Sequence, residues 1–437
     1  MNPGEKDPAH ARRDFLKLLG LGAATLAAGP LLRAPAFAAS AGAGQHVFGL
    51  RSDGKVVVID TGNDSLAKVI ETGGKGGNLG SLTQDGSRLF VANNGPAQRA
   101  LTVIDTQTLE KVADIETGNR PKHPVVSPDG ALVAVNHSQL DGGGFRVVFI
   151  STKDLKIVKT VDVPVEKTDA PGDFSMHGSW SPDGKLFAVG SYADNKVALI
   201  DGETLAVVAL TPVPGNPHYF DWFGREAWVT VEAGEPKEAG SLPLVVVMDT
   251  KDAAAPKIID RLTMDLEGSE TADLARVEGH HAILSNDGAL VIACNRGSGK
   301  ALEGVSVDVY SRADRKPKAH LDTGAKGVGH AYCSPDGRYA LLTQYNDTKV
   351  PVLDLANLKI AAVIDAGKGG HMGHVAFSAD GHKAYINNRK ADEVVVVDMG
   401  TLAIVGRIQT APAGEGQGMV LNRYYNVFER VVNPNLD

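Results

Sequence analysis

The stretch "VSPDGALVAVN" (residues 126–136) decides the fold, because it holds the end of one strand, a tight turn and a second strand. Asp-Gly supplies the positive-φ turn that joins two antiparallel strands. The same turn recurs as SPDG at 181–184 and 334–337, as SNDG at 285–288 and as SADG at 378–381. A recurring hairpin signal predicts a fold made of repeated antiparallel units.

Each unit continues with a third and a fourth strand. From residue 79 the chain reads "LGSLTQDG", "SRLFVANN", "ALTVIDTQT" and "LEKVADIETG", which shows all four strands in order. The units start near residues 79, 123, 177, 218, 281, 330 and 374. This spacing is typical of four-stranded β-propeller blades with loops of variable length.

The two ends of the repeat region predict how the ring closes. The segment that begins at His46 supplies only a second, third and fourth strand, and the tail "GQGMVLNRYYNVFERV" (416–431) offers a lone first strand. We therefore expect an all-β propeller of eight four-stranded blades, closed by pairing of the N- and C-terminal strands, which removes exposed sheet edges. Seven blades remain possible, because the fifth unit, "HYFDWFGREAWVTV" (218–231), lacks the turn motif.

Composition narrows the class of function. The 437-residue chain has a net charge of −8, 43% hydrophobic residues and 50 glycines. An acidic protein of this kind is not expected to bind nucleic acid. The chain contains neither a G-x-S-x-G motif nor a P-loop. We expect one propeller domain over residues 39–437 and a monomer, and we leave open whether it is an enzyme.

Residues 1–38 resemble a twin-arginine (Tat) export signal. Arg12 and Arg13 precede an apolar run that ends in a small-residue site at Ala38. The run is short and is broken by Pro30, so cleavage is expected rather than a permanent membrane anchor. This resemblance implies a mature protein in the periplasm.

A histidine precedes most of the turns at a constant distance. Five histidines lie four residues before the serine of the turn, and a sixth takes the matching place in the fifth unit; these are His123, His177, His281, His330, His374 and His218. The first strand of a propeller blade lines the central channel, so six imidazoles are expected at one mouth of it. Imidazole is a favoured ligand of zinc and copper. The sequence therefore predicts a metal site formed by these six residues.

Further candidates lie near the same mouth. His137, His280 and His371 are predicted to contribute to cofactor binding. Loops after the second strands are also expected to reach the rim, and they carry Asn94, Tyr192, Asn295, Gln344 and Asn388. No general base or nucleophile can be named from the sequence, and the pairing of Cys294 with Cys333 is left open.

The repeats themselves resemble a known family. "VSPDGALVAVN" and "LTVIDTQTLEKVADIETG" are similar to the YVTN-type repeats of bacterial periplasmic propellers, over residues 46–425. The blade count and the export signal also resemble the haem d1 propeller superfamily of cytochrome cd1, which implies haem d1 as a cofactor. The histidine ring resembles the copper sites of nitrous oxide reductase and thiocyanate dehydrogenase propellers, and the zinc-chaperone propellers of the periplasm.

Three hypotheses follow. In the first, the channel histidines bind copper or zinc for metal delivery or copper-dependent redox chemistry, with a periplasmic metal-receiving or electron-transfer protein as partner. In the second, the chain is a haem d1-binding or haem d1-maturation protein. In the third, it is a non-catalytic interaction scaffold whose histidines serve only packing.

Overall fold

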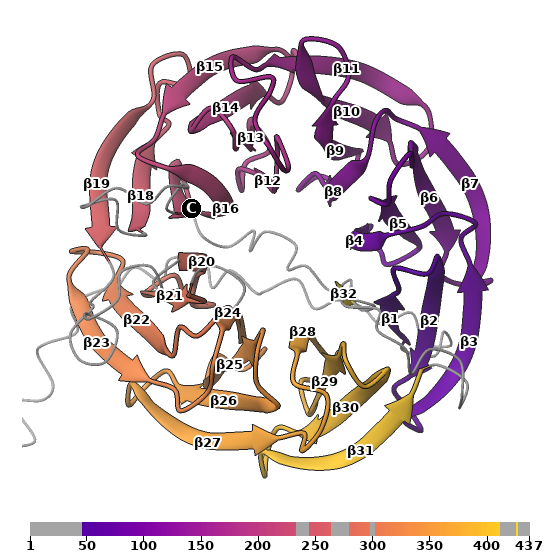
Figure 1. The fold of residues 1–437 in the computed structure, drawn as a ribbon, viewed down its shortest axis with the longest axis vertical. Coiled ribbons are helices and arrows are strands. Elements are labelled where there is room, and N and C mark those ends of the chain that lie inside the picture. The colour runs from indigo at the N-terminus through magenta and orange to yellow at the C-terminus, as the bar shows by residue number, and fades with distance from the viewer. Residues whose placement is uncertain (1–45, 233–243, 264–278, 298–301, 411–424, 427–437) are drawn as a thin grey trace, which may run out of the picture. The chain divides into compact units, whose positions relative to one another are not determined.

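The computed structural model describes residues 46–232, 244–263, 279–297, 302–410 and 425–426. Within the unit of residues 40–437, the strands form eight four-stranded antiparallel sheets that stand as blades around a ring (Figure 1). This confirms the predicted all-β propeller and shows that it has eight blades rather than seven. None of the described segments forms a helix long and apolar enough to cross a membrane. The predicted export signal, residues 1–38, lies outside the described residues.

Seven blades each take four consecutive strands, and the first strand of each lies innermost (Figure 1). Blades 2 to 4 comprise β4 (Gly77–Leu82), β5 (Arg88–Asn93), β6 (Ala100–Asp105), β7 (Glu110–Glu116), β8 (Pro121–Val126), β9 (Leu132–Leu140), β10 (Gly144–Ser151), β11 (Ile157–Pro164), β12 (Gly178–Trp180), β13 (Leu186–Ser191), β14 (Lys196–Asp201) and β15 (Val207–Pro212).

Blades 5 to 8 repeat this order around the rest of the ring. They comprise β16 (Asn216–Phe223), β17 (Glu226–Glu232), β18 (Leu244–Asp249), β19 (Lys257–Thr263), β20 (Gly279–Leu284), β21 (Leu290–Asn295), β22 (Ser306–Ser311), β23 (Pro317–Asp322), β24 (Val328–Cys333), β25 (Tyr339–Gln344), β26 (Lys349–Asp354), β27 (Lys359–Asp365), β28 (Met372–Phe377), β29 (Lys383–Asn388), β30 (Glu393–Asp398) and β31 (Ala403–Gln409).

Blade 1 closes the ring with strands from both ends of the chain. It contains β1 (His46–Leu50), β2 (Lys55–Asp60), β3 (Ser65–Glu71) and the short β32 (Tyr425–Asn426). β32 pairs antiparallel with β1, with Gly49 opposite Asn426 and Leu50 opposite Tyr425. The predicted closure is therefore confirmed, and the C-terminal strand takes the innermost place in blade 1 (Figure 1).

The repeated turn has the local bonding that its sequence requires. In blade 3, Ser127 Oγ donates to Asp129 Oδ1 over 2.6 Å, and the same oxygen accepts the N–H of Ala131 at 3.0 Å. Gly130 completes the turn with φ 74°. Equivalent Ser–Asp bonds recur in the turns at Ser181–Asp183, Ser285–Asp287, Ser334–Asp336 and Ser378–Asp380. This motif therefore fixes the register between the first and second strands.

We expect Gly130→Ala to destabilise the protein by about 1 kcal/mol, because a side chain is disfavoured at positive φ. A Cβ at Gly130 would meet only Gln84 carbons at 4.0 Å, so the penalty comes from the backbone and not from a clash. Gly400→Ala is the matched control, since this turn glycine does not have positive φ. Urea unfolding of both variants measures the difference, and equal stabilities would contradict the expectation.

The apolar core lies between neighbouring blades. Val56, Val57, Val58 and Ile59 of β2 are all fully buried, which shows that this strand is covered on both faces. Between blades 3 and 4, Trp180 packs edge-on against Phe149, with ring centroids 5.7 Å apart. Such packing of adjacent blades holds their inner strands at fixed positions around the channel.

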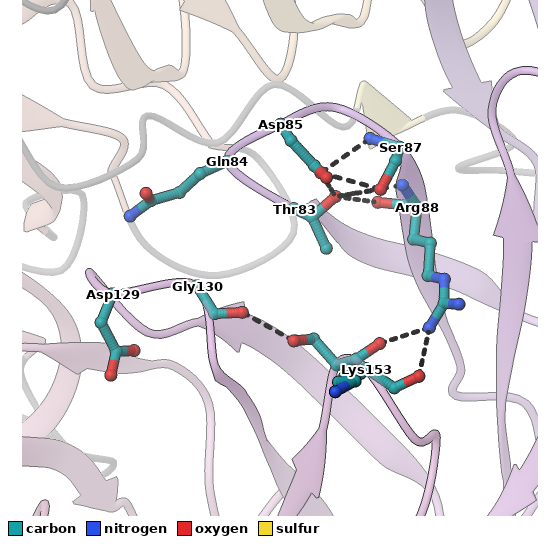
Figure 2. A pocket seen from close by; sticks show the side chains of 9 residues that line it. Thr83, Gln84, Asp85, Ser87, Arg88, Asp129, Gly130 and Lys153 are labelled. Carbon is teal, nitrogen blue, oxygen red and sulfur yellow. Dashed lines mark hydrogen bonds between the residues drawn. The ribbon is translucent and has the colours of Figure 1, made fainter.

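One groove lies at the turn side of the molecule. It has a volume of about 450 Å³ and is lined by the turns of blades 2 and 3, as Figure 2 shows. The guanidinium group of Arg88, which lines the groove, donates hydrogen bonds to the backbone carbonyls of Thr152 and Lys153. The turns at residues 83–87 and 127–130 come after the inner strands β4 and β8. The predicted histidines lie just before or near the beginning of the inner strands. The groove is therefore at the opposite end of the strands from the histidines.

The two cysteines of the chain are not joined in a disulfide. Cys294 at the end of β21 is fully buried, and burial raises the pKa of its thiol. Cys333 ends β24 and packs beside the core of blades 6 and 7. Both cysteines therefore pack in or beside the apolar core.

Candidate metal centre

Irregular strand pairing marks the histidine positions. The register between first and second strands shifts at Pro121/His123, Pro217/Tyr219, Gly279/Ala282, Val328/His330 and Met372/Val375. Each of these shifts includes or spans one or two of the predicted histidines. A β-bulge breaks the regular alternation of a strand and redirects the side chains beside it. The same shift occurs at Gly77/Gly80 in blade 2, which has no histidine there, so the bulge is a general feature of the blades that these histidines occupy.

Seven imidazoles make one continuous group, which we call the histidine cluster: His123, His177, His218, His280, His281, His330 and His374. Taken in this order, the centroids of successive rings lie 4.9, 5.1, 4.2, 4.8, 4.3 and 4.7 Å apart. The residues come from blades 3 to 8, and all six of the predicted metal ligands are among them. The structure therefore brings the predicted ring together.

Burial controls the charge of the cluster. Each of its seven residues is at most 7% exposed. Burial, reinforced by neighbouring charged or ionisable groups, lowers the pKa of His177, His280, His281, His330 and His374 well below the ordinary value. These imidazoles are neutral at pH 7, so each has one ring nitrogen with a lone pair. Neutral imidazole is the form that binds a metal ion.

Two groups of three histidines have the spacing of a metal site. The nitrogen atoms of His177, His218 and His281 all lie within 4.8 Å of one another, and so do those of His280, His281 and His330. Structural and catalytic zinc sites use three or four such ligands. The arrangement can hold an ion after small side-chain rotations.

Two nitrogens of the cluster lack a hydrogen-bond partner within the described residues. They are Nε2 of His218 and Nε2 of His281. Leaving a buried polar atom unsatisfied costs about 1–3 kcal/mol. A metal ion would satisfy these lone pairs, so the unsatisfied atoms favour a ligand in the channel over a purely structural role for the histidines.

Glu232 is a member of the site that the sequence did not reveal. It ends β17 and is 3% exposed. Its Oε1 lies 2.9 Å from His280 Nδ1, 3.0 Å from Arg296 Nη2 and 3.3 Å from His218 Nδ1. Tyr192, a predicted rim residue, donates its hydroxyl to the other carboxylate oxygen. Three groups of possible metal ligands occur among the described residues, and only the group of His218, Glu232 and His280 contains a carboxylate.

The environment of Glu232 keeps it ionised. Burial opposes ionisation, but the nearby His218 and Arg296 lower its pKa below the ordinary value. His280 Nε2 lies 2.8 Å from the hydroxyl of Tyr345, so both of its nitrogens have partners. His280 is thus fixed between an anion and a phenol. Binding of a metal ion by His280 would replace one of these two contacts.

The register of the strands gives the signal that could have found Glu232. It lies opposite Asn216, as Asn295 lies opposite Gly279 and Gln344 lies opposite Val328. Glu232 therefore takes the position of the rim residues Asn295 and Gln344 in the neighbouring blades. Because the fifth unit lacks the turn motif, this equivalence is hard to see in the sequence.

Two tyrosines orient histidines of the cluster. Tyr219 stacks on His281, with centroids 4.0 Å apart and an interplanar angle of 17°. The hydroxyl of Tyr332 lies 2.7 Å from His374 Nδ1. A hydrogen bond at one ring nitrogen fixes the tautomer and presents the other nitrogen to a ligand.

The other two predicted cofactor residues differ in their placement. His371 is 5% exposed and its ring lies 4.8 Å from that of Tyr345, beside the cluster. His137 has Nδ1 bound to the carbonyl of Arg146 at 2.9 Å and Nε2 bound to Thr117 Oγ1 at 3.0 Å. These contacts occupy both nitrogens of His137 and link blade 3 to blade 2.

Comparisons with known proteins agree with the fold. Residues 36–218, less than half of the chain, match the family described as cytochrome D1 heme domain. No curated protein matches the chain. The solved structure described as dihydro-heme d1 dehydrogenase NirN in complex with DHE is 18% identical, with a TM-score of 0.63, and the match covers 89% of this chain and 76% of that one.

Two further solved structures have the same fold. Apo AztD from Citrobacter koseri is 15% identical, with a TM-score of 0.61 and coverage of 88% of this chain and 97% of that one. The periplasmic gluconolactonase PpgL of Pseudomonas aeruginosa is 17% identical, with a TM-score of 0.55 and coverage of 73% and 94%. The resemblance to haem d1 propellers predicted from the sequence is confirmed by the family match over residues 36–218.

The geometry of the cluster limits how a haem could bind. Adjacent imidazole rings are only 4.2–5.1 Å apart, so no macrocycle fits between them as they stand. Imidazole is a common ligand of haem iron, so a haem at this site would be held by a histidine outside the tightly packed rings. His371 beside the cluster is suited to that contact, since its Nε2 has no hydrogen-bond partner within the described residues.

Proposed function

We propose that this chain is a periplasmic β-propeller whose channel histidines bind a zinc or copper ion, for metal delivery or for copper-dependent redox chemistry. The observation that carries the proposal is the pair of three-histidine groups, each with nitrogen atoms within 4.8 Å of one another. The periplasmic location rests on the resemblance of residues 1–38 to an export signal.

The chemistry of the donor atoms supports an ion rather than a packing role. Burial lowers the pKa of His177, His281 and His330 well below the ordinary value, so these three imidazoles do not have to lose a proton before they bind an ion. Three protein ligands leave a fourth position open on a tetrahedral ion. An open position lets a substrate bind, or lets a partner protein take over the ion by ligand exchange.

The residues around the cluster support the same assignment. Tyr219 and Tyr332 hold His281 and His374 in position, which reduces the side-chain entropy that metal binding must overcome. The negative charge of Glu232 lies beside His218 and His280 and offsets the positive charge of a bound ion. A buried cation is otherwise strongly disfavoured.

Haem d1 binding is the second candidate, and the family match over residues 36–218 favours it. The similarity to NirN, described in complex with DHE, points in the same direction. A haem d1 would supply iron-centred redox chemistry, and His371 is the residue that we expect to ligate it. The buried residues of the cluster would then help to exclude water from the site.

Metal analysis of protein purified from the periplasm separates the candidates. We expect stoichiometric zinc or copper without a visible haem spectrum, and loss of most of that metal in the double variant His177→Ala/His330→Ala, because each three-histidine group loses one ligand. The exposed His382→Ala serves as the control. A haem spectrum would support the second candidate, and a protein with neither metal nor haem would support the interaction scaffold.

A further inference from the structure

We infer that the histidine cluster holds two metal ions, one at His177 and His218 and the other at His281 and His330. This inference rests on the proposed metal binding and adds the number and the placement of the ions. The two three-histidine groups share only His281, so they mark two positions and not one.

The number of imidazoles exceeds the capacity of one ion. A zinc or copper ion in a protein typically takes three or four imidazole nitrogens. The cluster supplies seven buried imidazoles in continuous contact. With a single ion, at least three of them would stay buried without a metal bond. Two ions use the available donors more completely.

Additional histidines lie at both ends of the cluster, one beside each position. At one end, His123 Nδ1 lies 3.4 Å from His177 Nδ1. At the other, the rings of His330 and His374 have centroids 4.7 Å apart. His123 therefore lies beside the first position and His374 beside the second, while His281 belongs to both groups of three.

Glu232 is better suited to stabilise both ions than to ligate one. A third group of possible ligands consists of His218, Glu232 and His280. However, Oε1 of this carboxylate already lies 3.0 Å from Arg296 Nη2 and 2.9 Å from His280 Nδ1. Glu232 borders the first position through His218 and the second through His280. Its charge therefore reduces the repulsion between two cations.

The test is the stoichiometry of binding to the metal-free full-length protein. Zn²⁺, and in a separate titration Cu²⁺, is added in a calorimeter, and the metal retained after desalting is measured by mass spectrometry. We expect two ions per chain with at least one of these metals. One ion per chain would overturn this inference and leave the proposed function standing, whereas no binding of either metal would overturn both.

Single variants assign the two positions. His177→Ala and His330→Ala should each retain one ion, and His382→Ala, with a side chain 82% exposed, should retain two. Circular dichroism confirms folding, and the more conservative His177→Asn and His330→Asn replace any alanine variant that fails to fold. Retention of two ions by either variant, or loss of both ions from either, would overturn the assignment of separate positions.

Discussion

The metal-free protein should lose stability steeply between pH 6.5 and pH 4.5, mostly at pH values above the range in which ordinary carboxylates protonate. Burial lowers the pKa of seven histidines, to about 4 for His137 and to about 2 for His371, and well below the ordinary value for His177, His280, His281, His330 and His374. In the unfolded chain each returns to a pKa of about 6.5.

The sign of this dependence follows from proton linkage. Below pH 6.5 the unfolded chain binds protons that the folded protein excludes, so stability is present at neutral pH and is lost as the pH falls. Each such histidine contributes a slope of about 1.4 kcal/mol per pH unit. Even if only half of the seven histidines contribute this slope, a fall of two pH units would remove most of the free energy of unfolding of an ordinary domain.

Urea unfolding of the metal-free protein at pH 7.0, 6.0 and 5.0 measures the effect. The variant His330→Gln removes one of these histidines. It should reduce the slope of the free energy of unfolding against pH by the contribution of about one proton. His382→Gln, at an exposed position, should leave the slope unchanged. A free energy of unfolding that stays constant from pH 7 to pH 5 would contradict the burial of neutral imidazoles.

Glu232→Ala should destabilise the protein by about 3–5 kcal/mol, because it removes one partner from a buried charge network. Without the carboxylate, Arg296 keeps a largely buried positive charge and His280 Nδ1 loses its acceptor. Tyr192 also loses the acceptor of its hydroxyl. Glu232→Gln keeps the shape of the side chain but not the charge, so its effect should be intermediate.

Thermal and urea unfolding of these variants are compared with Glu203→Ala, which alters an exposed glutamate in the turn between β14 and β15. The control should lie within about 0.5 kcal/mol of the parent protein. If Glu232→Ala is as stable as Glu203→Ala, the carboxylate does not have the role assigned to it.

The sequence predicted the architecture because one local motif recurs with its chemistry intact. Ser127, Asp129 and Gly130 define their turn through contacts within a few residues, and these contacts are the same in every copy. The spacing of His177 and His330 from the turn then placed both at the channel. Ring closure followed from a missing strand at one end and a spare strand at the other.

The parts of the site that the sequence did not predict depend on tertiary contacts. Arg296 and Tyr345 directly follow the predicted rim residues Asn295 and Gln344, yet they are the side chains that contact Glu232 and His280. A difference of one position along a strand end decides which side chain faces the channel. His137 shows the converse, since its nitrogens are taken by groups of blades 2 and 3 that spacing alone does not reveal.

A crystal structure of the zinc-loaded or copper-loaded protein, with anomalous scattering recorded at the absorption edge of the metal, tests the central claim most directly. We expect anomalous density in the channel within about 2.0–2.3 Å of imidazole nitrogens of His177 and His218, and of His281 and His330. Channel histidines without anomalous density, with the metal bound only at the molecular surface, would contradict the account.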